Sequence, residues 1–190
     1  INNIKNLGFF SATDAEVQPG SQFNSKIINF SVEEKATGEI SLGAGTGTSG
    51  ATIGFGVKEN NFLGKGINLD AFATITEETA KGKFSVKNPN FRNSDKSITT
   101  SIEALEIDRT SSTGYKTNKT GFSFGTNFEF YDDLNLGLGI SNFYEKIETD
   151  STASALQKTQ DGNYWDSFLA VNFDYDKRDQ KFQTTDGFRS

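Results

Sequence analysis

Phe122-Ser-Phe-Gly-Thr-Asn-Phe-Glu-Phe130 and, after the interruption Tyr131-Asp-Asp133, Leu134-Asn-Leu-Gly-Leu-Gly-Ile140 decide the fold of this chain. In both segments, with the exception of Thr126, a large apolar residue occupies every second position. Serine, glycine, asparagine or glutamate occupies the positions between them. A period of two places successive side chains on opposite faces of a β-strand. The two segments therefore predict an antiparallel strand pair with one apolar face and one polar, glycine-containing face.

The same alternation recurs through most of the chain after Gly38 and predicts six further strands. Their apolar positions lie within residues 40–44, 53–57, 67–75, 84–86, 98–107 and 169–175. In Ile98–Ile107 the apolar set shifts from one parity to the other, which indicates a β-bulge. No stretch of ten residues in this region holds a helical period, so we expect the region to be all-β.

The connections between the predicted strands alternate in character. One set is polar, rich in threonine and serine and mostly long: Thr46–Gly50, Glu77–Lys81, Thr110–Lys119 and Thr149–Gly162. The other set is mostly tighter or carries aromatic, glycine or proline residues: Asn60–Gly66, Asn88–Lys96 and Tyr131–Asp133. Successive connections therefore belong to opposite ends of the strands. Two-faced strands of about 9–11 residues with such loops are typical of a transmembrane antiparallel β-barrel.

The composition favours the same interpretation. Hydrophobic residues make up 34% of the chain, whereas 19 glycines and 18 phenylalanines are many for 190 residues. Glycine suits a crowded lumen face, and aromatic residues near strand ends suit the interfacial girdles of a membrane barrel. The aromatic residues in question are Phe62, Phe91, Tyr131, Tyr164 and Trp165. A soluble β-sandwich or a lipocalin-type barrel also alternates and is the structural alternative.

Several classes of function are excluded by the residues that the chain lacks. It has no cysteine and no histidine, which removes disulfides, thiolate chemistry, histidine-based triads and imidazole metal sites. The net charge of −6 argues against nucleic-acid binding. Glu103, Glu106 and Asp108, like Asp174 and Asp176, lie close together in sequence, but a solvated face is the favoured interpretation. We therefore expect no enzyme activity, no cofactor and no metal.

Lys58–Asp70, KENNFLGKGINLD, has the glycines and the lysine of a phosphate-binding loop but not its spacing. Glu59 stands where that loop needs its first glycine, and Gly66 replaces the hydroxyl residue that follows the lysine. The residues that follow alternate as a strand and do not form the required helix. No nucleotide is expected, and the stretch predicts a hairpin turn reversed at Gly64 and Gly66.

The first 37 residues have a different pattern. We expect a helix end at residues 1–7, Gly8 in the left-handed conformation after it, a strand at Thr13–Gln18, a turn at Pro19-Gly20 and a strand at Lys26–Glu34. The second strand could accept a partner strand at its edge, although an ordinary sheet strand is at least as good an interpretation.

Five motifs, in the same order along the chain, resemble the BamA family of outer-membrane assembly factors. They are Asn6-Leu-Gly-Phe-Phe10, Val32-Glu-Glu-Lys35 with Thr37–Gly45, Lys58–Gly66, Val86–Phe91, and Asp176–Asp179 with Thr185–Arg189. The first two are similar to the end of the last POTRA (polypeptide-transport-associated) domain and its passage into the first barrel strand. The other three are similar to periplasmic turns.

The resemblance implies POTRA domains followed by a barrel of about 16 strands, of which this chain would hold a part. Residues 1–37 would be the C-terminal part of the last, α+β POTRA domain. Residues 38–190 would be the N-terminal half of the barrel, with about eight strands and the start of a ninth. The family's arginine-glycine loop is not matched by Gly187-Phe188-Arg189. The implied location is the bacterial outer membrane with the N-terminal part in the periplasm. The implied partners are unfolded outer-membrane proteins, accessory assembly lipoproteins and outer-membrane lipid.

In this family the first barrel strand pairs weakly with the last and templates an incoming strand. The corresponding residues here are Glu39, Ile40, Ser41, Leu42, Gly43, Ala44, Gly45 and Thr46. Glycine weakens strand order, and a weakly paired edge is a site for β-augmentation. We therefore expect the backbone of residues 39–46 to bind a client strand, with no catalytic side chain. The alternative is that the glycines relieve crowding at the barrel wall.

The residues expected to shape the periplasmic turns are Asn61, Phe62, Leu63, Gly64, Gly66, Asn88, Pro89, Phe91, Thr185, Asp186 and Gly187. Two other functions remain open. One is a related POTRA-barrel translocase of the autotransporter-assembly or two-partner-secretion type. The other is a passive porin or a lipid-modifying barrel enzyme, which the lack of histidine and the POTRA-like start disfavour.

Overall fold

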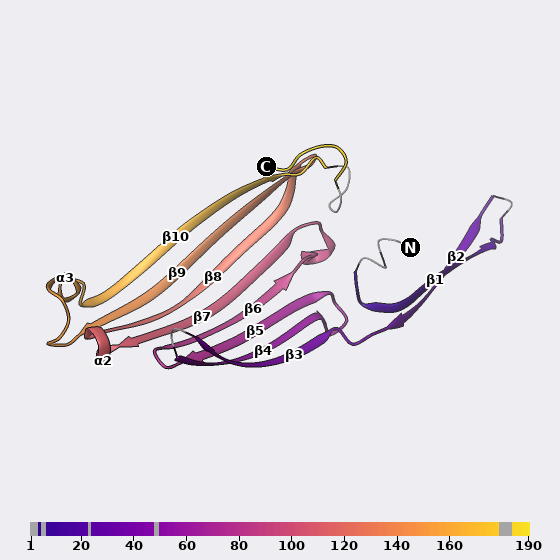
Figure 1. Cartoon of the computed structure of the whole chain (residues 1–190). Helices are drawn as coiled ribbons and strands as arrows, with labels where there is room; N and C mark the ends of the chain where they lie inside the picture. The colour runs from indigo at the N-terminus through magenta and orange to yellow at the C-terminus, as the bar shows by residue number, and fades with distance from the viewer. Residues whose placement is uncertain (1–3, 5–6, 23, 48–49, 179–183) are drawn as a thin grey trace.

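The computed structural model describes residues 4, 7–22, 24–47, 50–178 and 184–190 and contains two separate antiparallel sheets (Figure 1). The smaller sheet pairs β1 (Phe10–Pro19) with β2 (Lys26–Glu34). The predicted strands at residues 13–18 and 26–34 are therefore confirmed. Gly8 has a φ of 72°, as expected, but most of the predicted helix at residues 1–7 lies outside the described residues.

The larger sheet holds eight consecutive strands, each paired with the next along the chain. They are β3 (Gly38–Gly47), β4 (Gly50–Phe62), β5 (Ile67–Thr76), β6 (Thr79–Asn88), β7 (Ser97–Arg109), β8 (Tyr115–Tyr131), β9 (Leu134–Thr149) and β10 (Gly162–Tyr175). Strands β3 and β10 form the two edges of this sheet in the described part of the chain. The all-β, antiparallel prediction is confirmed.

Three short helical turns interrupt the connections. They are η1 (Phe91–Asn93), α2 (Thr110–Thr113) and α3 (Ala155–Lys158). Among the described residues, no helix is long and apolar enough to cross a membrane.

A ninth strand begins after β10. The Tyr175 and Ser190 amides each donate to the other residue's carbonyl, at 3.1 and 2.9 Å, and the Lys177 amide donates to the Phe188 carbonyl at 3.0 Å. Asp176 and Arg189 form an antiparallel bridge between these bonds. The predicted start of a ninth strand is thus confirmed.

One face of the large sheet is apolar and exposed. Its register aligns Ile40, Val57, Ala71, Phe84, Ile102 and Phe122 in one row across six strands. On β10 the same face carries Trp165, Leu169, Val171 and Phe173, all more than half exposed. Water-exposed apolar area of this extent would be unfavourable, so the face is suited to lipid contact.

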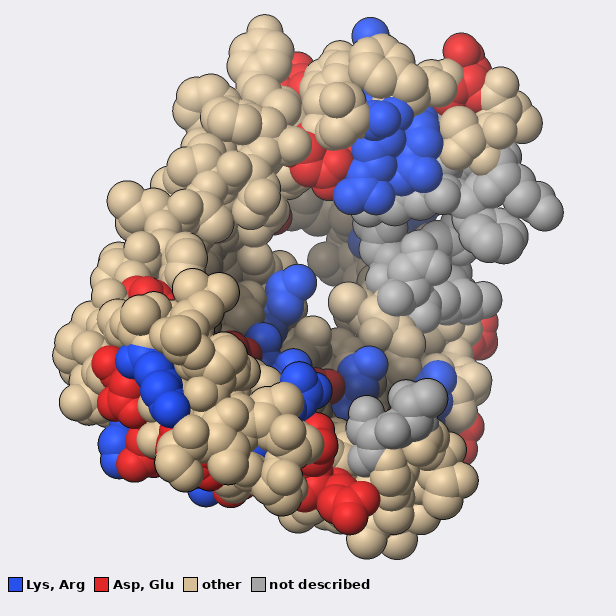
Figure 2. Space-filling model, turned by 60° about the vertical axis from the view of Figure 1, so that its left-hand side comes forward, with Lys and Arg blue, Asp and Glu red and all other residues tan. Residues whose placement is uncertain are grey.

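The opposite face is polar and lines a hollow. Figure 2 shows lysine, arginine, aspartate and glutamate side chains within the hollow, while much of the surrounding outer surface is uncharged. On this face Lys83 pairs with Glu103 at 3.5 Å, and Lys119 pairs with both Glu145 and Asp166 at 3.5 and 3.3 Å. Paired charges next to water are the expected lining of a barrel lumen.

The β-bulge predicted within Ile98–Ile107 is wrong. Strand β7 pairs with β6 and β8 without any register shift. The parity of the apolar residues changes because the two faces exchange polarity towards the end of the strand. Ile107 faces the hollow, where its register partner Thr117 and, beyond it, Ile147 are among the few buried residues.

Two predictions about the connections are also wrong. The connection predicted at Glu77–Lys81 is shorter than expected, because β5 ends at Thr76 and β6 starts at Thr79. The second half of Thr110–Lys119 is strand, because β8 starts at Tyr115 and runs for 17 residues. Loop length therefore does not separate the two ends of the sheet, although the connections do alternate between them.

Charge pairing explains the extra length of β7 and β8. Lys116 on β8 contacts Glu106 at 3.1 Å and Asp108 at 3.0 Å on β7, on the outward side beyond the apolar residues. These ion pairs continue the strand pairing where the outward face is polar. Apolar alternation could not reveal such a segment.

The aromatic residues near strand ends divide between the two faces. Trp165 lies on the apolar face, 74% exposed, with its ring centroid 5.2 Å from that of Tyr144 on β9. Tyr164 points to the other face and donates its hydroxyl hydrogen to the Gln160 carbonyl at 2.9 Å. Its predicted girdle role is therefore wrong, because neighbouring residues of a strand face opposite ways.

Trp165 is the single tryptophan of the chain. Its fluorescence therefore reports how deep in the bilayer the start of β10 lies. Because its indole lies where the apolar residues of β10 give way to polar ones, we expect emission quenching by bromines near the lipid headgroups to exceed quenching by bromines near the bilayer centre. Fluorescence in vesicles of the two brominated lipids measures this. Equal quenching by the two lipids would contradict a girdle position, and Trp165→Phe supplies the background.

Gly121 is required by close packing inside the hollow. A Cβ at this position would overlap the Phe143 ring and the Asn142 carbonyl, whereas one at Gly54 would lie 3.9 Å from its nearest neighbour, the Thr74 hydroxyl. We expect Gly121→Ala to lower the free energy of unfolding by about 1–3 kcal/mol. The matched lumen-face variant Gly54→Ala is expected to change it by less. Urea unfolding in micelles, followed by Trp165 fluorescence, provides the comparison, and equal effects would contradict the packing.

Candidate functional site: the open edge of strand β3

Strand β3 has one side paired with β4 and one side open. The register runs from Gly38 opposite Glu59 to Gly47 opposite Gly50 without a shift. The Asn60 amide donates to the Thr37 carbonyl at 3.3 Å, so residue 37 belongs to a hydrogen-bonded pair. Because such pairs alternate in an antiparallel ladder, the odd residues of β3 bond to β4. The N–H and C=O groups of residues 38, 40, 42, 44 and 46 therefore point to the open side.

The side chains of β3 follow the same alternation. Ile40 and Leu42 point to the apolar face and are 75% and 78% exposed, and Ala44 continues their row. Glu39 and Ser41 point to the hollow, followed by Gly43, Gly45 and Gly47. The residues whose backbone faces the open edge are thus the ones whose side chains face outward.

The lumen-facing glycines of β3 are not explained by crowding. No described atom lies within 4 Å of the position of a Cβ at Gly43, Gly45 or Gly47. On β4, by contrast, a Cβ at Gly56 would lie 2.6 Å from the Ser41 hydroxyl. The described residues therefore do not crowd these three glycines. These glycines leave the lumen face of the C-terminal half of β3, residues 43–47, without side-chain packing.

The first predicted turn joins β4 to β5. Leu63, Gly64 and Gly66 all have positive φ, at 56°, 69° and 65°, and Phe62 ends β4. The Asn61 carbonyl accepts from the Gly64 amide at 2.9 Å, and its side-chain oxygen accepts from the Gly66 amide at 2.7 Å. The prediction of a hairpin turn is confirmed.

The second predicted turn joins β6 to β7. Asn88 is the last residue of β6, and its side-chain oxygen accepts from the Asn90 amide at 3.1 Å. Pro89 follows, and the Phe91 amide donates to the Lys96 carbonyl at 2.8 Å. The segment closes as a loop at the same end of the sheet as the first turn.

The third predicted turn, Thr185-Asp-Gly187, follows β10. Gly187 has a φ of 92°, and its amide donates to the Asp186 side chain at 2.8 Å. A Cβ here would overlap the Lys177 carbonyl, so the position requires glycine.

Two forked ion pairs beside this turn were missed by the sequence interpretation. Arg189 contacts both carboxylate oxygens of Asp174 at 2.7 and 2.8 Å, and Arg178 contacts both oxygens of Asp176 at 2.7 Å. They line a cavity of about 320 Å³ together with Glu129. Bidentate pairs of this kind fix orientation. The Arg189–Asp174 pair therefore holds the start of the ninth strand against β10, and the Arg178–Asp176 pair fixes the segment directly after β10. The alternating aspartates before an arginine-containing turn were the signal.

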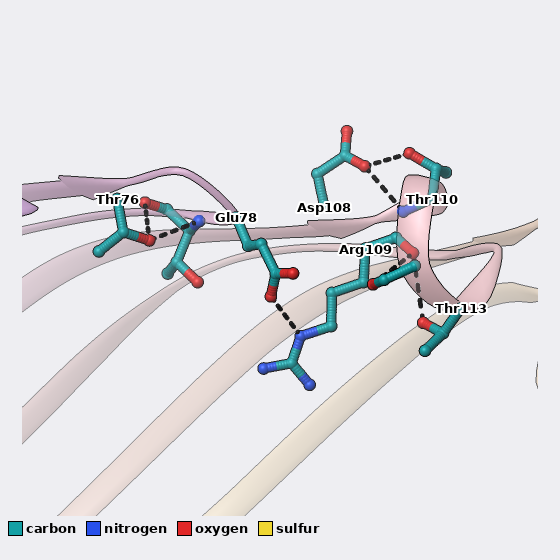
Figure 3. Close-up of polar contacts among 8 residues, drawn as sticks. Thr76, Glu78, Asp108, Arg109, Thr110 and Thr113 are labelled. Carbon is teal, nitrogen blue, oxygen red and sulfur yellow. Dashed lines mark hydrogen bonds and ion pairs between the residues drawn. The ribbon is translucent and has the colours of Figure 1, made fainter. Parts of the chain in front are cut away.

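At the opposite end of the sheet, polar contacts close the connections after β5 and β7 (Figure 3). Arg109 contacts Glu78 at 2.9 Å, and Asp108 accepts from both the amide and the hydroxyl of Thr110. The carboxylates suspected of chemistry are therefore in ion pairs or turns. No group of three or more metal-binding side chains occurs in the part of the chain that the structure describes.

The model of the Omp85 superfamily domain matches residues 61–190, more than half of the chain. The chain belongs to the Omp85 superfamily. It is 27% identical over 143 residues to the outer membrane protein assembly factor BamA of Neisseria meningitidis serogroup B, covering 71% of this chain and 18% of that protein. The BamA-like resemblance of the sequence is thereby confirmed.

Among solved structures, BamA from Haemophilus ducreyi lacking POTRA domains 1–3 matches with a TM-score of 0.67 and 21% identity, over 98% of this chain and 39% of that one. This likeness shows that the fold is shared with that structure. CdiB from Acinetobacter baumannii matches with a TM-score of 0.47 and 9% identity, over 90% of this chain and 36% of that one, and supports no conclusion. This chain spans less than a fifth of its Neisseria relative. The assignment of residues 1–37 to a POTRA domain stays a prediction.

The forked contact with Arg178 holds the pKa of Asp176 at about 2, below the ~3.9 of a free aspartate. A depressed pKa means that the pair stabilises the fold above about pH 4 and that this contribution is lost as the pH falls towards 2. Carboxyl carbon shifts followed by NMR in micelles should give this low midpoint. Arg178→Gln should return it towards 3.9, and an unchanged midpoint in the variant would contradict the contact.

Proposed function

We propose that the chain forms the N-terminal half of the barrel of an outer-membrane protein assembly factor, and that the open edge of β3 templates the strands of client proteins. A client is here an unfolded outer-membrane protein. The superfamily membership and the BamA relative support the assembly role. The observation that carries the proposal is the edge itself, with unpaired backbone groups on the residues whose side chains face outward.

The unpaired edge has a physical reason to bind a strand. An unpaired N–H or C=O costs several kcal/mol in hydrocarbon, so an edge there is stable only when a strand covers it. A client strand laid against Ile40, Leu42 and Ala44 pairs these groups by β-augmentation. Because pairing uses the main chain, it accepts many client sequences. No catalytic side chain, cofactor or nucleotide is required, and we propose that the protein is not an enzyme.

The apolar face becomes shorter towards this edge. On β10 it extends from Trp165 to Tyr175, which corresponds to about 24 Å along the membrane normal for a strand tilted by ~45°. On β3 it extends from Ile40 to Ala44, or about 10 Å by the same geometry. A bilayer next to a short apolar face must thin, and this lowers the cost of bringing a polar client edge to β3.

The partners follow from the same role. We propose that they are unfolded outer-membrane proteins, accessory assembly lipoproteins and outer-membrane lipid. The chain would lie in the bacterial outer membrane, with residues 1–37 in the periplasm as the end of the last POTRA domain. The superfamily match is equally compatible with a translocase that passes a polypeptide across the membrane, and the test below separates insertion from passage.

The alternation of β3 supplies a sharp test. Proline at Leu42 removes an N–H that faces the open edge, whereas proline at Ser41 removes one that bonds to β4. In full-length protein reconstituted into liposomes, we expect Leu42→Pro to slow client folding about tenfold, because one backbone hydrogen bond is worth about 1–1.5 kcal/mol. Ser41→Pro should instead lower the yield of folded barrel.

Client folding is scored by the heat-sensitive migration of folded barrels on gels. Leu42→Ala is the matched control for the lost side chain and should fold clients at close to the wild-type rate. Folding by Leu42→Pro at the wild-type rate would overturn edge templating. Passage of the client into the liposome interior without insertion would favour the translocase.

A further inference from the structure

The segment between the two sheets is held on both sides of a single residue. The Lys35 amide donates to the Phe9 carbonyl at 3.0 Å, which closes the base of the β1–β2 hairpin. The Thr37 carbonyl accepts from the backbone amide and from the side-chain amide of Asn60, both at 3.3 Å. Ala36 is thus the one residue between a contact with the hairpin and a contact with β4.

The Thr37 side chain adds a stronger contact. Its hydroxyl donates to Glu59 Oε1 at 2.5 Å, and the same oxygen accepts from the Asn61 amide at 2.7 Å. A charged acceptor makes such bonds about twice as strong as neutral ones. We call Thr37, Glu59 and Asn60, with these bonds, the Thr37 latch. Its three residues are half-buried, and Thr37 directly precedes the first residue of β3.

Two close approaches surround the latch. A Cβ at Gly38 would lie 3.0 Å from Glu59 Oε2, so the carboxylate packs against the start of β3. A Cβ at Gly66 would lie 3.7 Å from the Phe9 ring, so the base of the hairpin also contacts the β4–β5 turn. That turn is bound to the latch through Asn61, whose side chain accepts from the Gly66 amide.

Strand β3 is therefore held unequally along its length. Its base is fixed by the latch, whereas Gly43, Gly45 and Gly47 meet no described atom within 4 Å. We infer that Glu59 is a positioning residue for the edge of β3, and that through the latch the β1–β2 hairpin controls whether this edge is ordered for pairing. The inference rests on the edge-templating function proposed above and adds its regulation.

The control works through rigidity. A displacement of the hairpin reaches Thr37 across Ala36 alone and moves Glu59 and the first turn together with the base of β3. With the latch closed, residues 38–42 keep their register with β4 and present their open-edge groups in line. With the latch broken, disorder of the glycine-containing half extends to the base, and a client strand loses its template.

Thr37→Val removes the hydroxyl donor and keeps the side-chain shape, and Thr37→Ser restores the donor. In the full-length protein, we expect Thr37→Val to speed amide hydrogen exchange at Glu39 and Ser41, whose amides bond to β4, several-fold and to slow client folding about fivefold. Thr37→Ser should match the wild type in both measurements. Exchange in β9 is the internal control and should be unchanged, since a general loss of stability would raise it as well.

Inserting two glycines after Ala36 distinguishes control of the β3 edge by the β1–β2 hairpin from support of β3 by the latch alone. The insertion leaves the latch residues intact, so exchange at Glu39 and Ser41 should stay at the wild-type level while client folding slows. Wild-type exchange and wild-type client folding in Thr37→Val would overturn the latch. Wild-type client folding in the insertion variant would overturn control by the hairpin. The exchange measurement involves no client. It therefore tests whether the latch orders the base of β3 even if Leu42→Pro shows that edge templating is wrong.

Discussion

Backbone hydrogen bonding is the constraint on which the rest of this structure depends. A strand that faces lipid has no water to satisfy its N–H and C=O groups, so each strand must pair on both sides. Strands β4 to β9 meet this requirement by pairing with their neighbours in sequence. Strand β3 meets it on one side, and no described atom lies within 4 Å of the Cβ position of its Gly43, Gly45 or Gly47. In the described part of the chain, the open edge of β3, like the outer side of β10, therefore needs a further strand.

Side-chain chemistry then decides how far the sheet extends. Within the apolar band, Phe122 and Leu169 face outward, whereas Gly121 and Ser123 beside Phe122 and Ala170 beside Leu169 face the hollow. Beyond it, the faces exchange character, and ion pairs such as Lys116 with Asp108 continue the pairing. The sheet thus crosses the membrane by burying apolar residues in lipid and extends past it by pairing charges. The hollow stays polar in the band because lipid solvates only the outer face.

The sequence predicts the strands well because an alternating segment has one physical solution, a two-faced strand. The prediction fails where apolar and polar residues no longer alternate. Tyr115–Lys119 is strand, yet both of its faces are polar, and Leu105 and Ile107 change parity without a bulge because the surroundings of the faces change. Ion pairs such as Glu78 with Arg109 join residues 31 positions apart. Such pairs depend on register, which composition does not contain.

The candidate site was predictable in position but not in geometry. Alternation and the family motifs indicate that Glu39–Thr46 forms the first barrel strand. Which of its backbone groups remain free follows from a single bond, from the Asn60 amide to the Thr37 carbonyl, because it sets the phase of the ladder. The same bond belongs to the latch. One short contact thus fixes both the base of β3 and the identity of the groups that its edge presents, so any motion that breaks the contact also changes which groups the edge presents.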